Sequence, residues 1–434
     1  MIATSSRFAP APRLALLVCL AGVPLLFGWT WLNGGLNAGL LVVTFVDWLL
    51  SRRRVEAVRK PAGVLSLGAE NLMHLELRSP GVPVDLELRD DLPLPFALVG
   101  DWPKVKLGGS NWEAAGYRLR PGRRGQYAAG PLHGRYASPL GLWRRTLTWS
   151  LVEPVRVYPN LLAARQWEIA IRKGRHLEGL KRSRVRGGGT EFESLREYQP
   201  GDQYRAISWP ASARSGKLIT TLYQVDRSQP VMLLIDAGRM MIPQVKGITK
   251  LDHSLNAGLL LATVAAERGD QCGLMLFGGE VKAFMPPKKG RGQVLAMVEA
   301  LYAVEPEQVE PDYGRMISWL RAKHKKRSLM VLFTDMVDPD ISRGLVNHLS
   351  ALASHHLVLL VCLSDPELLR LSRLTPTDSA EVYQKAAALE VLAQRAEIAA
   401  LLQSRGVAVI DVPPEEFSTA VVNQYLTVKE EGRL

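Results

Sequence analysis

Two acidic residues stand where predicted strands end, and their type and position could support ligand or metal binding. Asp236 follows the apolar run 231–235, and Asp335 follows the apolar run 329–334. In open α/β sheets, ligands bind at the carboxyl ends of the strands. Carboxylate oxygens are also ligands that Mg2+ prefers. The two aspartates are therefore the first candidates for a binding site.

A second candidate region is the strongly basic stretch 161–229. It holds thirteen Lys and Arg residues against seven Asp and Glu residues. This surplus of six positive charges is half of the chain's net charge of +12. Three consecutive glycines, 187–189, would let backbone amides turn toward an anion. No Gly-Lys-Ser/Thr sequence follows them, so this is not a nucleotide-binding P-loop. Composition alone predicts a flexible basic connector between two domains.

The elements that would position the two aspartates alternate between strand-like and helical patterns over residues 230–434. This alternation is typical of a doubly wound parallel α/β sheet. The expected strands are residues 231–235, 272–277, 281–285, 329–334, 357–363 and 407–412. The expected helices are residues 251–268, 293–302, 313–324, 383–404 and 414–425.

Residues 61–160 have short runs in which apolar and polar residues alternate, as in 72–77, 84–89 and 146–151. A period of two gives each strand one buried face and one wet face. Turn sequences such as Pro121-Gly122 recur between these runs. The pattern predicts a small antiparallel domain resembling a β-sandwich, with no cluster of potential metal ligands.

The N-terminal part, residues 1–60, predicts a transmembrane helical hairpin. Uncharged apolar runs cover 14–31 and 36–50, each near the ~20 residues that span a bilayer. The polar sequence Asn33-Gly34-Gly35 is the expected turn. A signal peptide is the alternative for the first run, but a second run follows at once and no cleavage site is convincing.

Basic residues predict the orientation of this hairpin. Arg7 and Arg13 precede the first run, Arg52–Arg54, Arg59 and Lys60 follow the second, and the expected turn has none. The positive-inside rule then places both ends and the following domains in the cytoplasm, at a bacterial inner membrane. Asp47, near the inner end of the second run, is expected to reach water or the following arginines rather than to relay protons.

Composition limits the remaining function classes. The chain has 434 residues, of which 47% are hydrophobic, and this excludes a disordered protein. Three scattered cysteines and eight dispersed histidines form neither a disulfide framework nor a zinc site. Nucleic-acid binding is not expected, because interleaved aromatics and known modules are lacking. Anionic lipid headgroups of the bilayer are the simpler explanation of the basic excess.

The basic region carries a long motif that resembles a known family. The sequence from Gly187 to Leu218 is similar to the signature of the bacterial family called domain of unknown function 58, DUF58. Upstream sequences 121–125 and 138–142 support the resemblance. The residues that carry it in the motif are Glu191, Phe192, Arg196, Tyr198, Asp202, Arg205, Trp209 and Arg214.

The resemblance implies a membrane-tethered protein whose C-terminal domain is similar to a von Willebrand factor A domain. Such proteins are commonly encoded beside a MoxR-type AAA+ ATPase and sometimes beside a transglutaminase-like membrane protein. The role that this implies is an adaptor or chaperone-like one.

The A-domain resemblance also implies a metal site, and this sequence lacks most of its ligands. The site uses Asp-x-Ser-x-Ser after the first strand, a later threonine and a further aspartate. Here Gly238 and Met240 replace the serines, and the segment Val309-Glu310-Pro311-Asp312 before the expected helix offers no threonine. Only Asp236 and Asp335 remain, with Asp338 and Asp340 nearby. We expect a degenerate site without a cofactor, in which Arg239, a neighbouring lysine or a partner's cation meets the acids. Weak Mg2+ binding by the two aspartates is the alternative.

The motif residues have two competing interpretations. Acids and arginines such as Glu191, Arg196, Asp202, Arg205 and Arg214 could form a network that fixes the segment to the A domain. Phe192, Tyr198 and Trp209, with Leu195 and Ile207, would supply its buried face. The same residues could instead form a partner-docking surface. Catalysis is not expected, because no nucleophile and base are paired.

Together these observations predict a membrane-anchored, non-enzymatic interaction adaptor that works with a MoxR-type AAA+ ATPase on envelope-associated proteins. The alternative is a metal-dependent A-domain protein with enzymatic activity in envelope metabolism. The missing hydroxyl ligands favour the adaptor.

Overall fold

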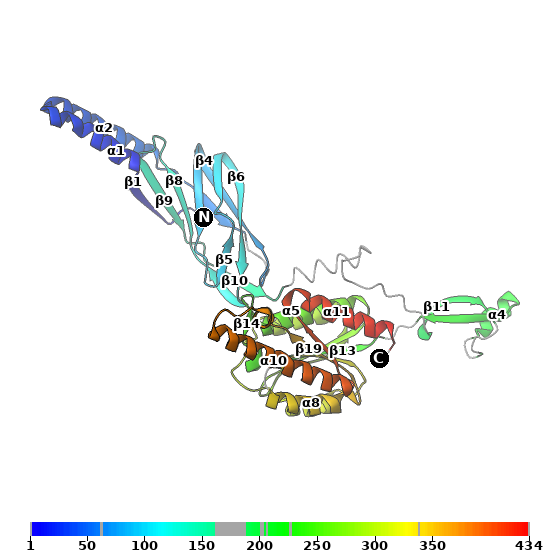
Figure 1. Ribbon diagram of the computed structural model, residues 1–434. Coiled ribbons are helices and arrows are strands. Elements are labelled where there is room, and N and C mark those ends of the chain that lie inside the picture. The colour runs from blue at the N-terminus through cyan, green and yellow to red at the C-terminus, as the bar shows by residue number, and fades with distance from the viewer. Residues whose placement is uncertain are drawn as a thin grey trace. The chain divides into compact units, whose positions relative to one another are not determined.

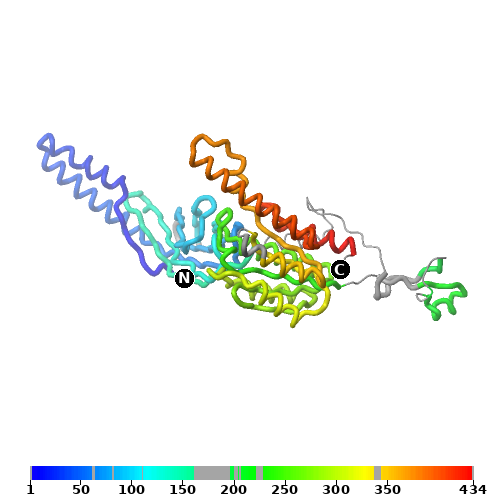
Figure 2. The backbone as a smooth tube through the Cα atoms, turned by 60° about the horizontal axis from the view of Figure 1, so that its bottom comes forward, coloured from blue at the N-terminus to red at the C-terminus, as the bar shows by residue number. Residues whose placement is uncertain are grey.

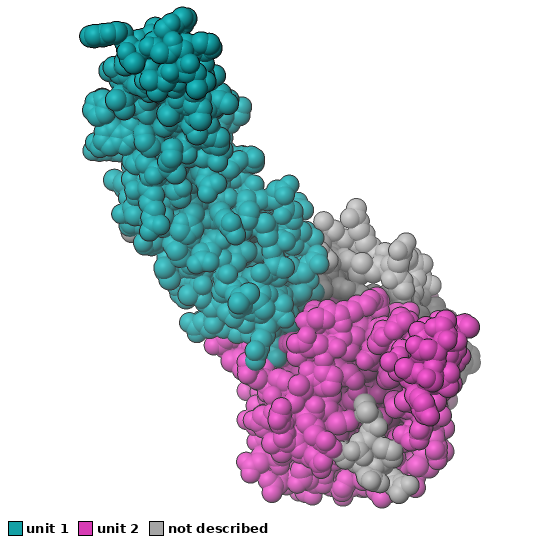
Figure 3. Space-filling view, turned by 60° about the vertical axis from the view of Figure 1, so that its left-hand side comes forward, with its two compact units in different colours: residues 1–160 teal, residues 161–434 magenta. Residues whose placement is uncertain are grey.

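The computed structural model describes residues 2–60, 64–160, 188–199, 204, 207–224, 228–336 and 339–432, with side chains omitted at 81–82, 110, 188–195, 221–224 and 339–343. The chain divides into two compact units, Met1–Asn160 and Leu161–Leu434, which Figure 3 colours separately. Each unit has its own sheets and its own core.

Unit 1 is built from two β-sheets. Its strands are β1 (Ser5–Pro10), β2 (Glu56–Arg59), β3 (Val64–Ser66), β4 (Asn71–Asp90), β5 (Phe96–Val99), β6 (Lys104–Pro121), β7 (Gly125–Ala129), β8 (Leu132–Ala137), β9 (Trp143–Trp149) and β10 (Glu153–Tyr158). The larger sheet has the order β1-β9-β8-β4-β6-β5 with β2 on β4, and the smaller sheet has the order β3-β10-β7. The predicted alternation holds along β4, where Leu86 and Leu88 are buried while Glu87 and Arg89 are exposed.

Two features of unit 1 differ from the sequence prediction. Strand β1 has no counterpart in the sequence prediction, and it pairs antiparallel with β9. Strands β4 and β6 are long, with 20 and 18 residues. Register shifts between Leu77 and Val84 let this pair continue past the turn sequence Ser79-Pro80-Gly81.

The N-terminal apolar residues form α1 (Pro12–Gly22), the 3-10 helix η1 (Val23–Phe27) and α2 (Thr30–Leu50). Figure 1 shows α1 and α2 side by side at one end of unit 1. Helix α2 has 21 residues and is long and apolar enough to cross a membrane. At 1.5 Å per residue it is about 31 Å long, near the hydrocarbon thickness of a bilayer. Helix α1 is shorter.

The turn between the two helices lies at Gly28 and not at Asn33-Gly34-Gly35, which are inside α2. Gly28 has φ +73°, a left-handed conformation that glycine adopts without strain. The polar Asn33 is accommodated in the helix because its side-chain amide donates a hydrogen bond to the Ala21 carbonyl of α1, at 2.7 Å. Local polarity therefore predicted the wrong turn.

Asp47 is fully buried, which contradicts the expectation that it reaches water or the following arginines. Its carboxylate accepts hydrogen bonds from the Leu140 N–H at 2.9 Å, the Leu142 N–H at 3.2 Å and the Ser138 hydroxyl. These donors belong to the loop between β8 and β9. The carboxylate thus fixes the end of α2 to the larger sheet.

Arg59, one of the basic residues that follow the second apolar run, is also buried. Its guanidinium lies 2.5 Å from a carboxylate oxygen of Asp90 and donates to the Gly130 carbonyl at 3.0 Å. Tyr117 donates its hydroxyl to the same carboxylate. Burial raises the pKa of Asp90 despite these partners. The pair is a structural element of the unit 1 core.

Unit 2 contains the predicted doubly wound sheet. Its strands are β13 (Pro230–Asp236), β16 (Gln271–Phe277), β17 (Val281–Lys289), β18 (Leu329–Phe333), β19 (Leu357–Leu363) and β20 (Ala408–Val412). The order is β17-β16-β13-β18-β19-β20, parallel throughout except for the antiparallel edge strand β17. The central strand β13 is buried along its whole length, as expected for a parallel strand covered on both faces.

Helices cover both faces of this sheet. They are α5 (Lys250–Glu267), α6 (Arg291–Leu301), α7 (Tyr313–Lys323), α8 (Pro339–Ala353), α9 (Pro366–Arg373), α10 (Ser379–Ser404) and α11 (Pro414–Glu430), with η3 (Arg239–Met241) and the small hairpin β14 (Gln244–Val245) and β15 (Ile248–Thr249) before α5. Met232 and Leu234 pack in one core layer with residues of α7 and α8. Leu233 and Ile235 face Gly258 of α5 on the other side. Helix α9 packs on α10, the pair drawn in orange in Figure 2.

The described part of the basic region forms β11 (Gly188–Glu197) and β12 (Ile219–Gln224), which pair antiparallel, and α4 (Trp209–Ser215). Pro210 lies in the first turn of α4. Proline is favoured there because the first helical N–H groups have no partner within the helix.

Candidate functional site

The candidate site lies at the carboxyl edge of the unit 2 sheet, where Asp236 ends β13. Asp236 is fully buried. It accepts hydrogen bonds from the Gly238 N–H at 2.7 Å and from the Thr334 hydroxyl at 2.6 Å. Thr334 in turn shares a 2.9 Å hydrogen bond with the hydroxyl of Tyr313. Burial raises the pKa of Asp236 to about 6. The carboxyl is thus enclosed by groups of its own chain.

Asp335 lies after the neighbouring strand β18 and is 3% exposed. One of its oxygens pairs with the ammonium of Lys250 and the other with the guanidinium of Arg395. Its backbone neighbour Met336 also donates an N–H, at 2.8 Å. Each carboxylate oxygen therefore already has a cationic partner.

Arg395 continues this network to the end of the sheet. Its guanidinium donates two hydrogen bonds to Asp411 of β20, at 2.9 and 3.1 Å. The Ser364 hydroxyl after β19 donates to the same carboxylate at 2.6 Å. The planar guanidinium group of an arginine has enough N–H donors to bind two carboxylates at once. The ends of β18, β19 and β20 are thereby connected through one buried arginine.

Lys250 and Arg395 were not singled out from the sequence, although each carries a local signal. Thr249 caps α5 by accepting the Asp252 N–H at 3.1 Å, which makes Lys250 the first helical residue. A cation at this end of a helix opposes the helix dipole, so it indicates an acidic partner elsewhere. Arg395 stands in an Ala- and Leu-rich helix predicted to pack on the sheet, where a buried cation needs a carboxylate.

The residues at this edge do not fit the metal site that the A-domain resemblance implies. A Cβ added at Gly238 would lie 2.8 Å from the Val309 carbonyl oxygen, so the backbone leaves no room for the serine of the motif. Met240 offers no oxygen ligand, and Asp312 before α7 caps that helix by accepting the Arg315 N–H at 2.8 Å. Among the described residues, no group of three or more His, Cys, Asp or Glu side chains could hold a metal ion. Asp338 lies outside the described residues, as does the side chain of Asp340.

Arg239 does not supply the positive charge to the buried acids, as one of the alternatives expected. Its guanidinium lies 2.9 Å from Glu310. Its N–H donates to the Val309 carbonyl at 2.9 Å. Val309 is 46% exposed. These three residues form the exposed loop layer next to the buried Asp236, and we call them the Arg239–Glu310 layer.

The motif residues are only partly described. Asp202 and Arg205 lie outside the described residues, as do the side chains of Glu191 and Phe192. The backbone of Glu191 lies opposite Gln224, and that of Phe192 opposite Tyr223, in the β11–β12 pair. Arg196 opposes Thr220.

The predicted buried face of the motif is partly wrong. Trp209 is 67% exposed and does not join it, whereas Ile207 is buried. Tyr198 stacks on Tyr204 at 6.1 Å between ring centroids. Arg214 is exposed and has no ion pair among the described residues. The joint and the docking surface both stay predictions.

Comparison with known proteins agrees with the resemblance found in the motif. Residues 194–397 match the family described as "Protein of unknown function DUF58". An uncharacterized protein of Mycobacterium tuberculosis, Rv1480, is 24% identical over 184 residues, which cover 42% of this chain and 57% of that protein. The uncharacterized protein YeaD of Bacillus subtilis is 27% identical over 35% of this chain and 39% of its own length. The chain thus spans little more than half of the first relative and about two fifths of the second.

Two solved structures are also similar to this chain. The SpRpn10 VWA domain covers 45% of this chain and 94% of its own, with 15% identity and a TM-score of 0.30. The match to the conserved hypothetical protein BatB from Bacteroides thetaiotaomicron extends over 47% of this chain and 99% of that one, with 12% identity and a TM-score of 0.29. Both TM-scores are below 0.5, so the description of the unit 2 fold rests on its own strand order.

Proposed function

We propose that this protein is a membrane-anchored, non-enzymatic adaptor whose unit 2 binds a partner protein without a metal ion. The observation that carries the proposal is the pairing of Asp335 with Lys250 and Arg395. Protein ammonium and guanidinium groups occupy the carboxylate that an A-type site would offer to a metal. This edge of the sheet then holds a fixed internal ion-pair network, which stabilises the loops above it.

The anchor is proposed to be α1 and α2 together, as a two-pass hairpin in the bacterial inner membrane. The length and apolar character of α2 support one span. The side-by-side packing of α1 against α2 and the lack of basic residues at their turn support two. Both termini and both units would then be cytoplasmic.

The partner is proposed to be a MoxR-type AAA+ ATPase, acting on envelope-associated proteins and in some cases with a transglutaminase-like membrane protein. The match to the DUF58 family and the resemblance of the motif support this choice. Asp236 and Asp335 are too deeply buried to touch a partner. The contact surface at this edge is therefore proposed to be the Arg239–Glu310 layer.

A capture experiment with purified full-length protein in detergent tests this surface. The Val309→Asp variant places a charge in the centre of the layer and should reduce capture of the purified ATPase, in the presence of ATP, by about tenfold. The matched control is Val382→Asp on α10, because Val382 is 52% exposed and Val309 is 46% exposed. Equal capture by both variants would show that the layer is not the contact surface. No capture by the unchanged protein would show that the ATPase is not the partner.

A further inference from the structure

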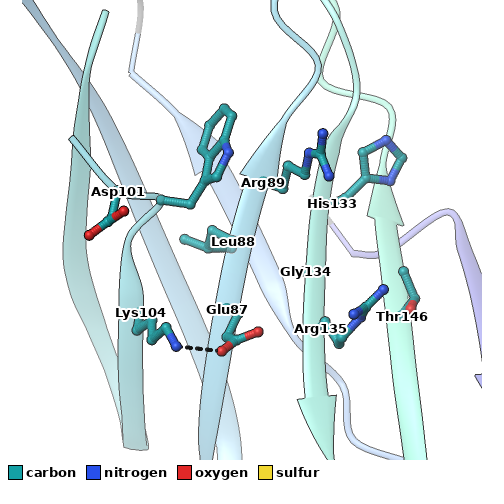
Figure 4. A pocket seen from close by; sticks show the side chains of 10 residues that line it. Glu87, Leu88, Arg89, Asp101, Lys104, His133, Gly134, Arg135 and Thr146 are labelled. Atoms are coloured by element: carbon teal, nitrogen blue, oxygen red, sulfur yellow. Dashed lines mark ion pairs between the residues drawn. The ribbon is translucent and has the colours of Figure 1, made fainter. Parts of the chain in front are cut away.

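The outer face of the larger sheet in unit 1 carries a groove that the proposed adaptor role does not use. Two adjoining hollows of about 550 and 530 Å³ lie over β4, β6, β8 and β9. They share Glu87, Lys104 and Arg135 in their lining. Figure 4 shows the first hollow, with these side chains on neighbouring strands. We call the two hollows together the β4–β8 groove.

Basic side chains predominate in this groove. Exposed cations from four strands line it: Arg89, Lys104, Lys106, Arg135 and Arg144. The acids that line it are Asp85, Glu87 and Asp101. Glu87 pairs with Lys104 at 2.7 Å. The positive charge of Lys104 lowers the pKa of Glu87, and Arg135 and Arg144 lower it further by smaller amounts. Five cations thus line the groove against three carboxylates.

Three arginines of the groove form no ion pair with a described carboxylate. Arg89, Arg135 and Arg144 form no ion pair within the part of the chain that the structure describes. Exposed arginines without a partner on the hollowed face of a sheet are suited to a carboxylate from another molecule, because the guanidinium binds carboxylates in a planar, bidentate manner.

The spacing of the three arginines indicates the shape of the ligand. Arg144 lies opposite Ala137 of β8, and Arg89 lies opposite His133 of the same strand. The three arginines stand on the adjacent strands β9, β8 and β4, at levels 137, 135 and 133 of β8, so they form a diagonal row across the sheet. Each step covers about 6.6 Å along the strands and about 4.8 Å across them, or about 8 Å in all. Long arginine side chains can meet from there the alternate side chains of an extended peptide, which are about 6.6 Å apart. A chain with acids at every second residue matches this row.

The position of the groove within unit 1 favours a polypeptide over a lipid headgroup. Its Arg144 end is beside Trp143, whose indole N–H donates to the Thr44 carbonyl of α2 at 3.0 Å. The row then continues along β8 away from that helix for about four residues, or about 13 Å. A headgroup at the membrane surface reaches the first of these arginines only, whereas an extended segment reaches all three.

We propose that the β4–β8 groove binds an extended acidic segment of a partner protein, with Asp or Glu at alternate positions. The segment would place three carboxylates against Arg144, Arg135 and Arg89. Its outward-facing alternate residues are left without contacts, so small polar residues would suffice there. This interaction does not depend on the Arg239–Glu310 layer, and the two surfaces can fail separately.

Fluorescence anisotropy with the full chain in phosphatidylcholine nanodiscs tests the groove. The probe is a labelled nine-residue peptide that alternates Glu with Ser, and its control alternates Gln with Ser. The unchanged protein should bind the Glu peptide at least tenfold more tightly than the Gln peptide, with an affinity that falls as salt rises. The triple variant Arg89→Gln, Arg135→Gln, Arg144→Gln should lose at least tenfold in affinity. Arg135→Gln alone should lose about threefold.

A matched variant separates the groove from net charge. Lys288→Gln, Lys325→Gln, Lys326→Gln removes three exposed cations of unit 2 and should bind the Glu peptide as the unchanged protein does. Equal weakening by the two triple variants would overturn the proposal in favour of a general charge effect. If the groove variant instead lost binding to phosphatidylglycerol vesicles while keeping the peptide, the proposal would also be wrong, and the arginines would serve a lipid surface.

Discussion

At the level of single residues, Asp236 couples the pH of the solution to the stability of unit 2. The pKa of its carboxyl is about 6 in the folded chain, against an ordinary value of 3.8. Between these values the folded state holds a proton that the unfolded state has lost. The free energy of unfolding should therefore fall as pH rises from 4 to 6, by about 3 kcal/mol from this residue, and stay lower above pH 6.

The Asp236→Asn variant should lack this fall. An amide can still accept the Gly238 N–H and can donate to the Thr334 oxygen, so the local hydrogen bonds are kept. Chemical unfolding of both proteins at pH 4, 5, 6 and 7 measures the difference. The control is Asp312→Asn at an exposed helix cap, where asparagine also serves. Parallel pH profiles for Asp236→Asn and the unchanged protein would show that the carboxyl is already ionised below pH 4.

The sequence predicts the acids of the candidate site better than their partners. Asp236 and Asp335 follow from the rule that strand ends meet at one edge of a sheet. Lys250 comes more than a dozen residues after the end of β13, and Arg395 comes from helix α10, late in the chain. Which cation reaches a buried acid depends on how helices pack, and hydrophobic periodicity does not encode that. From the sequence, Arg239 and a neighbouring lysine were equal candidates for the cation that pairs with the buried acids.

At the level of elements, the contact between α2 and the β8–β9 loop gives a prediction about Asp47. Replacing Asp47 by Ala would leave the Leu140 N–H, the Leu142 N–H and the Ser138 hydroxyl without an acceptor in a buried site. Each buried donor that loses its partner costs about 1–3 kcal/mol. The melting temperature of the full chain in detergent should therefore fall, with a loss of about 3 kcal/mol or more in unfolding free energy.

The matched control for this experiment is Glu113→Ala, which removes an exposed acid of β6 and should change stability by less than about 0.5 kcal/mol. Asp47→Asn should lie between the two, because an amide oxygen can accept only part of the three hydrogen bonds. If Asp47→Ala unfolded at the same temperature as Glu113→Ala, the carboxylate would not be what fixes α2 to the sheet.

The two units differ in how well the sequence predicts their elements. In unit 2 the predicted strands agree with the observed ones to within a few residues, because buried parallel strands are continuous apolar runs. In unit 1, β1 was missed, since Ser5–Pro10 has only one large apolar side chain, Phe8, and gains its place by pairing with β9. The turn of the N-terminal helices was misplaced for a related reason. Asn33 is polar, but its partner carbonyl lies on the other helix.

At the level of the whole molecule, the basic charge serves more than one purpose. Arg59 and Arg395 are buried and bind carboxylates within the protein. Arg89, Arg135 and Arg144 face outward in a groove. Arg52 stacks on Trp48, at 3.9 Å from the ring centroid, near the end of α2. Net charge alone could not separate these roles, since burial and pairing depend on the fold.

The proposed two-pass topology gives a whole-molecule prediction that labelling in intact cells can check. In a Cys19→Ser background, where Cys272 and Cys362 are buried, Thr30→Cys places a thiol at the turn between α1 and α2. A membrane-impermeant maleimide should label it from outside the inner membrane, because positive flanks keep both helix ends inside. Lys325→Cys, an exposed position of unit 2, should react only after the cells are permeabilised. The opposite pattern would place the units outside the cytoplasm, away from any cytosolic ATPase.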